Sequence, residues 1–111
     1  MAILGPHVAA SYVIKLLTKT QEALVEKSNK LVKEKGSYEM LEILHHFSSG
    51  FKAYLTEYAY IAMDEMRQAC GGAGFTMASG ISLNFGNNAP LVTFEGVNTV
   101  MMQQSSRLLL K

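Results

Sequence analysis

The sequence has 111 residues, of which 49% are hydrophobic and 17% charged, and its formal net charge is +1. This length suits one domain, and the near-neutral charge provides no global field that would attract nucleic acid or anionic lipid. The hydrophobic content excludes a disordered chain, and a single cysteine, Cys70, excludes an internal disulfide framework. Because soluble domains usually have about 25% charged residues, the low charge predicts that part of the surface faces a partner.

The first helix is expected over residues 7–35, which contain neither glycine nor proline. Pro6 suits a first helical turn, and Gly36 suits the cap that ends this helix. The expected packing face has apolar residues at helical spacing, namely Ala10, Val13, Ile14, Leu17, Leu24 and Leu31. No run reaches the roughly 18–20 apolar residues of a transmembrane helix.

The second helix is expected over residues 38–70, with Ser37 as its N-cap. Its apolar stripe steps by three and four residues through Met40, Leu44, Phe47, Phe51, Tyr54, Tyr58 and Ile61. Small residues at 48–50 interrupt the stripe, and they predict either a kink or the close approach of another helix.

Residues 71–94 contain no charged side chain and are rich in glycine and asparagine, which predicts one long ordered loop. Such loops inside compact chains are usually functional. A third helix is expected over residues 97–110. The sequence therefore predicts a single all-α domain over residues 1–111, with long antiparallel helices and this loop.

Two places in the chain could carry chemistry. Glycines cluster directly after the second helix, at residues 71–74, and they suit either a phosphate-binding nest or an ordinary helix cap. Cys70 beside them is expected to be a small buried side chain. Glu95 is the only charge between Arg67 and Arg107, which suits either a general base or a residue that caps the third helix.

Neither cysteine nor histidine predicts a metal site. His45 and His46 are adjacent, so their side chains point about 100° apart on a helix and cannot form an i,i+4 ligand pair. We expect structural or surface roles for both.

Three segments resemble signatures of the acyl-CoA oxidases, a branch of the acyl-CoA dehydrogenase superfamily. They are residues 46–54 (HFSSGFKAY), 67–75 (RQACGGAGF) and 93–100 (TFEGVNTV). Each motif is weak alone, but their order and spacing resemble those of the C-terminal helical part of the catalytic module. Ala73 and Val97 depart from the family signatures, which have His and an acidic residue there.

The resemblance implies a role for particular residues. Glu95 would remove the α-proton of a fatty acyl-CoA, with Phe94 and Gly96 lining the acyl pocket beside it. FAD would be contacted by Gln68, Gly71, Gly72, Asn98 and Thr99, the first three reaching the FAD of a neighbouring subunit. No metal is implied.

Two functions remain open at this stage. One is part of a FAD-dependent acyl-CoA oxidase of fatty acid β-oxidation, peroxisomal by resemblance, with mitochondria as the alternative. The other is a truncated, inactive relative that serves as a structural subunit of a larger complex. In both cases the chain alone is expected to be inactive, and a homodimer or heteromeric complex is expected to form through the second and third helices.

Overall fold

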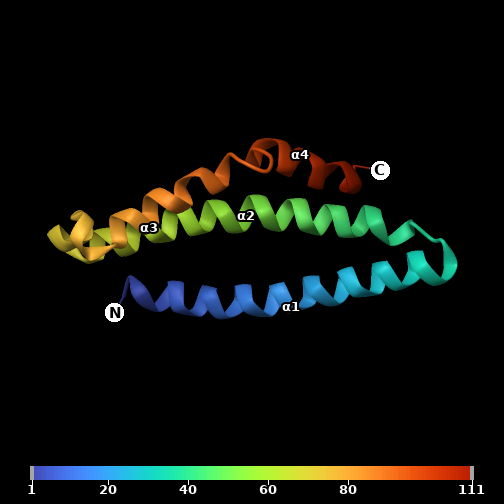
Figure 1. Cartoon of the computed structure of the whole chain (residues 1–111), viewed down its shortest axis with the longest axis horizontal. Coiled ribbons are helices and arrows are strands. Elements are labelled where there is room, and N and C mark those ends of the chain that lie inside the picture. The colour runs from blue at the N-terminus through green and yellow to red at the C-terminus, as the bar shows by residue number, and fades with distance from the viewer. Residues whose placement is uncertain (1, 111) are drawn as a thin grey trace.

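The computed structural model describes residues 2–110, which form four α-helices and three short 3₁₀ turns without any strand. The α-helices are α1 (Leu4–Lys35), α2 (Glu39–Ala69), α3 (Ile81–Asn88) and α4 (Asn98–Leu109). The 3₁₀ turns are Gly71–Gly74, Met77–Ser79 and Ala89–Val92. α1 and α2 form an antiparallel hairpin, and the chain then returns along α2 through α3 and α4 (Figure 1). The predicted all-α fold is confirmed.

α1 packs on α2 through a seam with a seven-residue repeat. Its less exposed side chains step by four and three residues along the helix: His7, Ala10, Ile14, Leu17, Gln21, Leu24, Ser28 and Leu31. This is the period by which two helices keep one face in contact over many turns. Val13, which the apolar pattern placed on this face, is exposed. Polar Gln21 lies in the seam instead, and its Nε2 donates to Ser48 Oγ at 2.6 Å.

The ends of the first two helices lie close to the predicted positions. α1 begins three residues before the predicted start, so that Pro6 lies in its first turn, and it ends at Gly36 with φ 61°. The N–H of Gly36 donates to the carbonyl of Val32 at 3.1 Å, which satisfies part of the helix end. The prediction of Ser37 as N-cap was wrong, because Tyr38 occupies that position and makes no side-chain capping hydrogen bond.

The small residues at 48–50 mark a close approach between α2 and α4. α2 is continuous through them, and a Cβ built on Gly50 would lie 2.9 Å from Ser105 Oγ. His46 on α2 lies beside the same serine, with its Nδ1 2.7 Å from Ser105 O and 2.9 Å from Ser105 Oγ. Of the two predicted explanations, close helix approach is therefore correct, and His46 has the expected structural role.

Residues 71–94 are ordered as expected, but most of them are helical rather than loop. Asparagine and glycine disfavour a helix at 81–88, so tertiary contacts override the local preference there. The ring of Phe85 lies 5.2 Å from that of Tyr60, and the Arg67 guanidinium lies 5.8 Å from the Phe85 centroid. These contacts hold α3 against the C-terminal half of α2.

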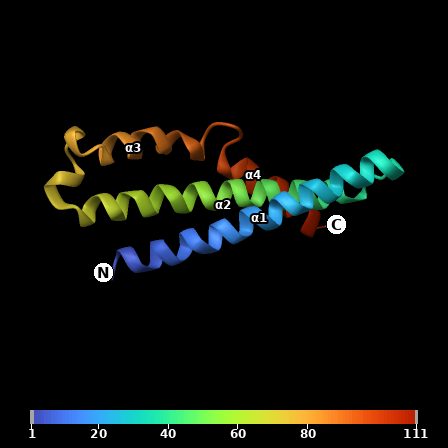
Figure 2. The same cartoon turned by 60° about the horizontal axis from the view of Figure 1, so that its bottom comes forward.

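Few large side chains are buried in this arrangement. Among the described residues, the buried apolar side chains are Ala53 and Ala62, at 0% and 4% exposure. Many large apolar side chains lie on the surface, including Tyr54 at 61% and Ile61 at 49%. Figure 2 shows from a second direction that the other helices lie along α2 in an extended arrangement that does not close into a bundle. This arrangement leaves large apolar side chains on the surface. Within residues 2–110, no helix combines the length and hydropathy needed to cross a bilayer.

Candidate active site

Glu95 lies in the short turn between the 3₁₀ turn Ala89–Val92 and α4. The backbone of Glu95 is left-handed, with φ 57°, and the next residue, Gly96, has φ 100°. The left-handed region costs a residue with a Cβ about 1–2 kcal/mol, so neighbouring contacts must hold the turn. The Glu95 side chain is exposed and has no hydrogen-bond or ion-pair partner among the described residues. The backbone therefore sets the direction of the Glu95 Cα–Cβ bond, from which the side chain extends.

The turn is fastened to the middle of α2 by a lysine. Lys52 Nζ donates to the carbonyl of Gly96 at 2.5 Å and to Asn98 Oδ1 at 2.9 Å. Thr56 Oγ1 donates to the same Asn98 oxygen at 3.1 Å. We call Lys52, Thr56, Gly96 and Asn98 the α2–α4 clamp.

Every hydrogen-bonding site of the Asn98 side-chain amide has a partner within the chain. Besides the two bonds that its Oδ1 accepts, its Nδ2 donates to the carbonyl of Ala53 and to Glu57 Oε2, both at 3.1 Å. An asparagine amide has two donors and two acceptor lone pairs. No hydrogen-bonding site therefore remains on this side chain for a cofactor.

Phe94 and Gly96 flank Glu95 in different surroundings. Phe94 is exposed and presents an apolar ring next to the carboxylate. Gly96 is packed by Met101, because a Cβ built on this glycine would lie 2.5 Å from Met101 Cε. The turn thus combines one free carboxylate, one free apolar ring and a glycine that nothing larger can replace without movement.

The glycine turn lies at the other end of α2. Gly71 has φ 58°, and a Cβ built on Gly71 or Gly72 would meet no atom within 4 Å. Gly74 differs, because a Cβ there would collide with the carbonyl of Arg67. Cys70, expected to be buried, is exposed, because the chain leaves α2 into solvent at this point.

Gln68 belongs to a polar cluster at the last turn of α2. Its Nε2 donates to Asp64 Oδ2 at 2.7 Å, and Arg67 donates to Asp64 Oδ1 at 2.6 Å. The hydrogen bond from Arg67, followed by the one from Gln68, holds the pKa of Asp64 below its ordinary value. Gln68 is exposed beside the open glycines.

The two groups of candidate residues do not converge within this chain. Lys52 contacts the turn that carries Glu95, and Ala69 is the last residue of α2 before the glycine turn. These two residues lie roughly 25 Å apart along α2 at 1.5 Å per residue. Asn98 and Thr99 lie with Glu95, whereas Gln68, Gly71 and Gly72 lie at the far end. A single ligand contacting both groups would have to span this distance or bind two copies.

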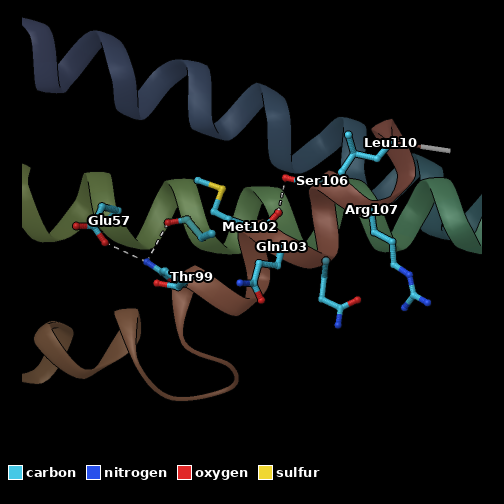
Figure 3. Close-up of a pocket in the computed structure, with 10 residues that line it drawn as sticks. Glu57, Thr99, Met102, Gln103, Ser106, Arg107 and Leu110 are labelled. Atoms are coloured by element: carbon cyan, nitrogen blue, oxygen red, sulfur yellow. Dashed lines mark hydrogen bonds between the residues drawn. The ribbon is translucent and has the colours of Figure 1, made fainter.

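An open groove of about 890 Å³ runs between α2 and α4 next to the turn. Figure 3 shows Glu57 and Thr99 at one end of it and Arg107 and Leu110 at the other. Glu57 and Lys52 were not predicted as site residues. The signal for Lys52 was present, since it is the only lysine between Lys35 and Lys111 and follows the small residues at 48–50. In the described part of the chain, no three His, Cys, Asp or Glu side chains gather as metal ligands.

Comparison with known proteins identifies relatives over nearly the whole chain. A family model described as "Acyl-CoA oxidase, C-alpha1 domain" matches residues 2–110. Peroxisomal acyl-coenzyme A oxidase 1 of Mus musculus is 36% identical over 97% of this chain, and the Homo sapiens protein of that name is 33% identical over the same share. Acyl-coenzyme A oxidase acox-1.1 of Caenorhabditis elegans is 34% identical over 97%. In each case the chain spans 16% of the relative's length.

Proposed function

The chain belongs to the acyl-CoA oxidase C-alpha1 domain family, and from this premise we propose that Glu95 is the base that starts oxidation of a fatty acyl-CoA. The observation that carries the proposal is the state of this side chain. Glu95 is an exposed carboxylate with no partner among residues 2–110, and its turn accepts a hydrogen bond from Lys52 of α2. A group that must accept a proton from a substrate needs that freedom.

A carboxylate suits the chemistry of this step. The thioester carbonyl of an acyl-CoA acidifies the hydrogen on the adjacent carbon, so a carboxylate in contact with that hydrogen can remove it as a proton. The α-proton moves to a Glu95 carboxylate oxygen, the β-hydrogen leaves with its electron pair as hydride, and a double bond forms between the two carbons. Phe94, exposed beside Glu95, offers an apolar surface for the acyl chain. Gly96 would line the same pocket only through its backbone, because Met101 fills the space where its Cβ would lie.

FAD, when bound, supplies the acceptor for the β-hydride. Gln68, Gly71, Gly72 and Thr99 are exposed and suit contact with it, and the two glycines would let a ligand approach the backbone closely. The Asn98 side chain does not suit such contact, because its four hydrogen-bonding sites are used within the chain. The separation along α2 supports the proposal that the glycine turn contacts the FAD of a neighbouring subunit.

Replacement of Glu95 by glutamine tests this function in the native flavin-containing assembly. Glutamine keeps the shape of the side chain but cannot accept the proton, and loss of a general base typically costs about 10²–10⁴ in rate. We expect Glu95→Gln to slow anaerobic bleaching of the flavin by fatty acyl-CoA by that factor, with acyl-CoA affinity retained. The matched control is Glu26→Gln on the exposed face of α1, which should bleach at the wild-type rate. Bleaching of the Glu95 variant at the wild-type rate would remove Glu95 from the reaction.

A second candidate function is that of a non-catalytic subunit. It is favoured by the scarcity of buried apolar side chains in this chain and by the exposed apolar residues on α2 and α4. Ala73 and Val97, which depart from the family signatures, agree with it. The absorbance of the native assembly distinguishes the two functions, because a non-catalytic subunit need not be associated with flavin.

The cellular compartment is also proposed from the relatives. The Mus musculus and Homo sapiens relatives are named as peroxisomal proteins, and we propose the same compartment here, with mitochondria as the alternative. Fractionation of cells that express the chain would separate the two.

A further inference from the structure

The strained turn that carries Glu95 is the feature that the proposed function leaves unexplained. Two successive residues, Glu95 and Gly96, are left-handed, and strain of this kind persists only where the surroundings hold it. Met101 packs its side chain against Gly96 from one side. The two ends of the turn are held by backbone hydrogen bonds, from Phe94 N–H to Pro90 O and from Met101 N–H to Val97 O. The side-chain hydrogen bonds to the turn come from α2.

Of the side-chain hydrogen bonds described at the turn, the one from Lys52 lies closest in sequence to Glu95. Its ammonium group donates to the carbonyl of Gly96, the residue that directly follows Glu95, and to Asn98, the first residue of α4. The lysine is half-buried in the middle of a continuous 31-residue helix, so the position of its Cα is fixed. One side chain thus joins the turn to both α2 and α4.

A lysine is an unexpected choice if this contact serves only to stabilise the fold. The N-terminus of α4 carries the positive end of the helix macrodipole, so a cation placed there is disfavoured. Thr56 Oγ1 already donates to Asn98 Oδ1. What only Lys52 supplies is the long, charged donor that reaches the Gly96 carbonyl, and that carbonyl belongs to the backbone which directs Glu95.

We propose that Lys52 is a positioning residue for Glu95. By holding the Gly96 carbonyl it fixes the left-handed turn, and the turn sets the position and the direction of the Cα–Cβ bond that carries the Glu95 carboxylate. This proposal rests on the proposed function for its catalytic consequence, but the mechanical part stands on the hydrogen bonds alone. Preorganisation of this kind matters because a displacement of about 1 Å at a reacting group can cost about 100-fold in rate.

The first test measures the turn itself by hydrogen–deuterium exchange of the chain in its native assembly. Lys52→Met removes the donors and keeps a chain of similar length. It should speed exchange of the hydrogen-bonded amides at the two ends of the turn, those of Phe94, Val100 and Met101, at least 10-fold. Lys52→Arg, which can still donate, should retain most of the protection. Lys19→Met, on the exposed face of α1, should change nothing at these amides. Unchanged exchange at all three amides in Lys52→Met would overturn the proposal. If that variant does not assemble, Lys52→Gln is measured in the same way.

The second test asks whether Lys52 acts through Glu95. Lys52→Met should lower kcat about 10- to 100-fold and leave KM within twofold, and Lys52→Arg should recover most of kcat. In a Glu95→Gln background, Lys52→Met should cause no further loss. Multiplicative losses in the double variant would assign Lys52 a general structural role and overturn the proposal. If Glu95→Gln alone has no effect, the proposed function fails, and the exchange measurement still decides whether Lys52 holds the turn.

Discussion

At the scale of single residues, the turn at 94–98 depends on one glycine. Gly96 has φ 100°, a value that side-chain-bearing residues rarely adopt, and the space where a Cβ would lie is filled by Met101. Glu95 before it already adopts a left-handed backbone. The turn therefore has little tolerance for a second residue with a Cβ.

We expect Gly96→Ala to lower the free energy of unfolding by about 1–3 kcal/mol, because the new methyl group adds backbone strain and displaces Met101. Chemical denaturation of the native assembly measures the change. Gly86→Ala is the matched control, since no atom lies within 4 Å of its Cβ position, its φ is not left-handed and it lies outside the proposed site. An equal effect of the two variants would show that the turn is not constrained.

The sequence identified part of this site and not the rest. Glu95 stood out because it is the only charge in a long uncharged stretch, and the surrounding motif gave it a role. The clamp from Lys52 could not be predicted, because the hydrogen bonds join residues 44 and 46 positions apart. Asn98 was assigned to FAD from its motif, whereas in the folded chain its amide is fully hydrogen-bonded to α2.

At the scale of elements, α2 is the framework on which everything else is arranged. α1 packs on one side of it and α3 and α4 on the other (Figure 1). The predicted apolar stripe of α2 therefore does not face one partner: Met40, Leu44, Phe51 and Tyr58 are partly covered, whereas Phe47, Tyr54 and Ile61 are exposed. The sequence pattern shows which residues are apolar, but it does not show how many neighbouring helices pack against them.

Element boundaries were predicted well where a local signal exists. Gly36 ends α1 at the predicted position because a left-handed cap needs glycine. α3 was missed because nothing local favours a helix at 81–88. The contacts of Phe85 with Tyr60 and Arg67 come from a helix more than ten residues away in sequence.

The close approach of α2 and α4 gives a test at this scale. Gly50→Leu keeps good helix propensity but places a large side chain where Ser105 Oγ lies 2.9 Å from the Cβ position. We expect a loss of about 1–3 kcal/mol in the free energy of unfolding, as for other overpacked contacts. Gly86→Leu on α3, where nothing lies within 4 Å, should not destabilise the chain. Denaturation curves with equal midpoints for both variants would contradict this account of the interface.

At the scale of the whole molecule, the chain is long and thin. Its extents are 57 × 25 × 24 Å and its radius of gyration is 17.4 Å, whereas a compact domain of this length would have a radius of about 13 Å. Such a shape cannot enclose a large core, and exposed apolar side chains are the result. The low charge fraction in the sequence pointed to the same property, although it could not place the exposed residues.

We therefore expect the chain to occur as a homodimer or within a heteromeric complex, through α2 and α4. Sedimentation at micromolar concentration should show a species larger than about 12 kDa, the mass of one chain. Ile61→Glu, at an exposed position of α2, should dissociate it. Val8→Glu on α1, at a site that is 68% exposed, should leave it intact. A single 12 kDa species with a sharp thermal transition would contradict the expectation.

The central claim is that Glu95 removes the α-proton, and isotope exchange tests it most directly. The native flavin-containing assembly is incubated in D₂O with an acyl-CoA whose third carbon carries no hydrogen, so that proton removal is observed without oxidation. Mass spectrometry of the recovered thioester should show deuterium at the second carbon with the wild-type chain, and incorporation at least 100-fold slower with Glu95→Gln. Incorporation at the wild-type rate by Glu95→Gln would show that another group takes the proton.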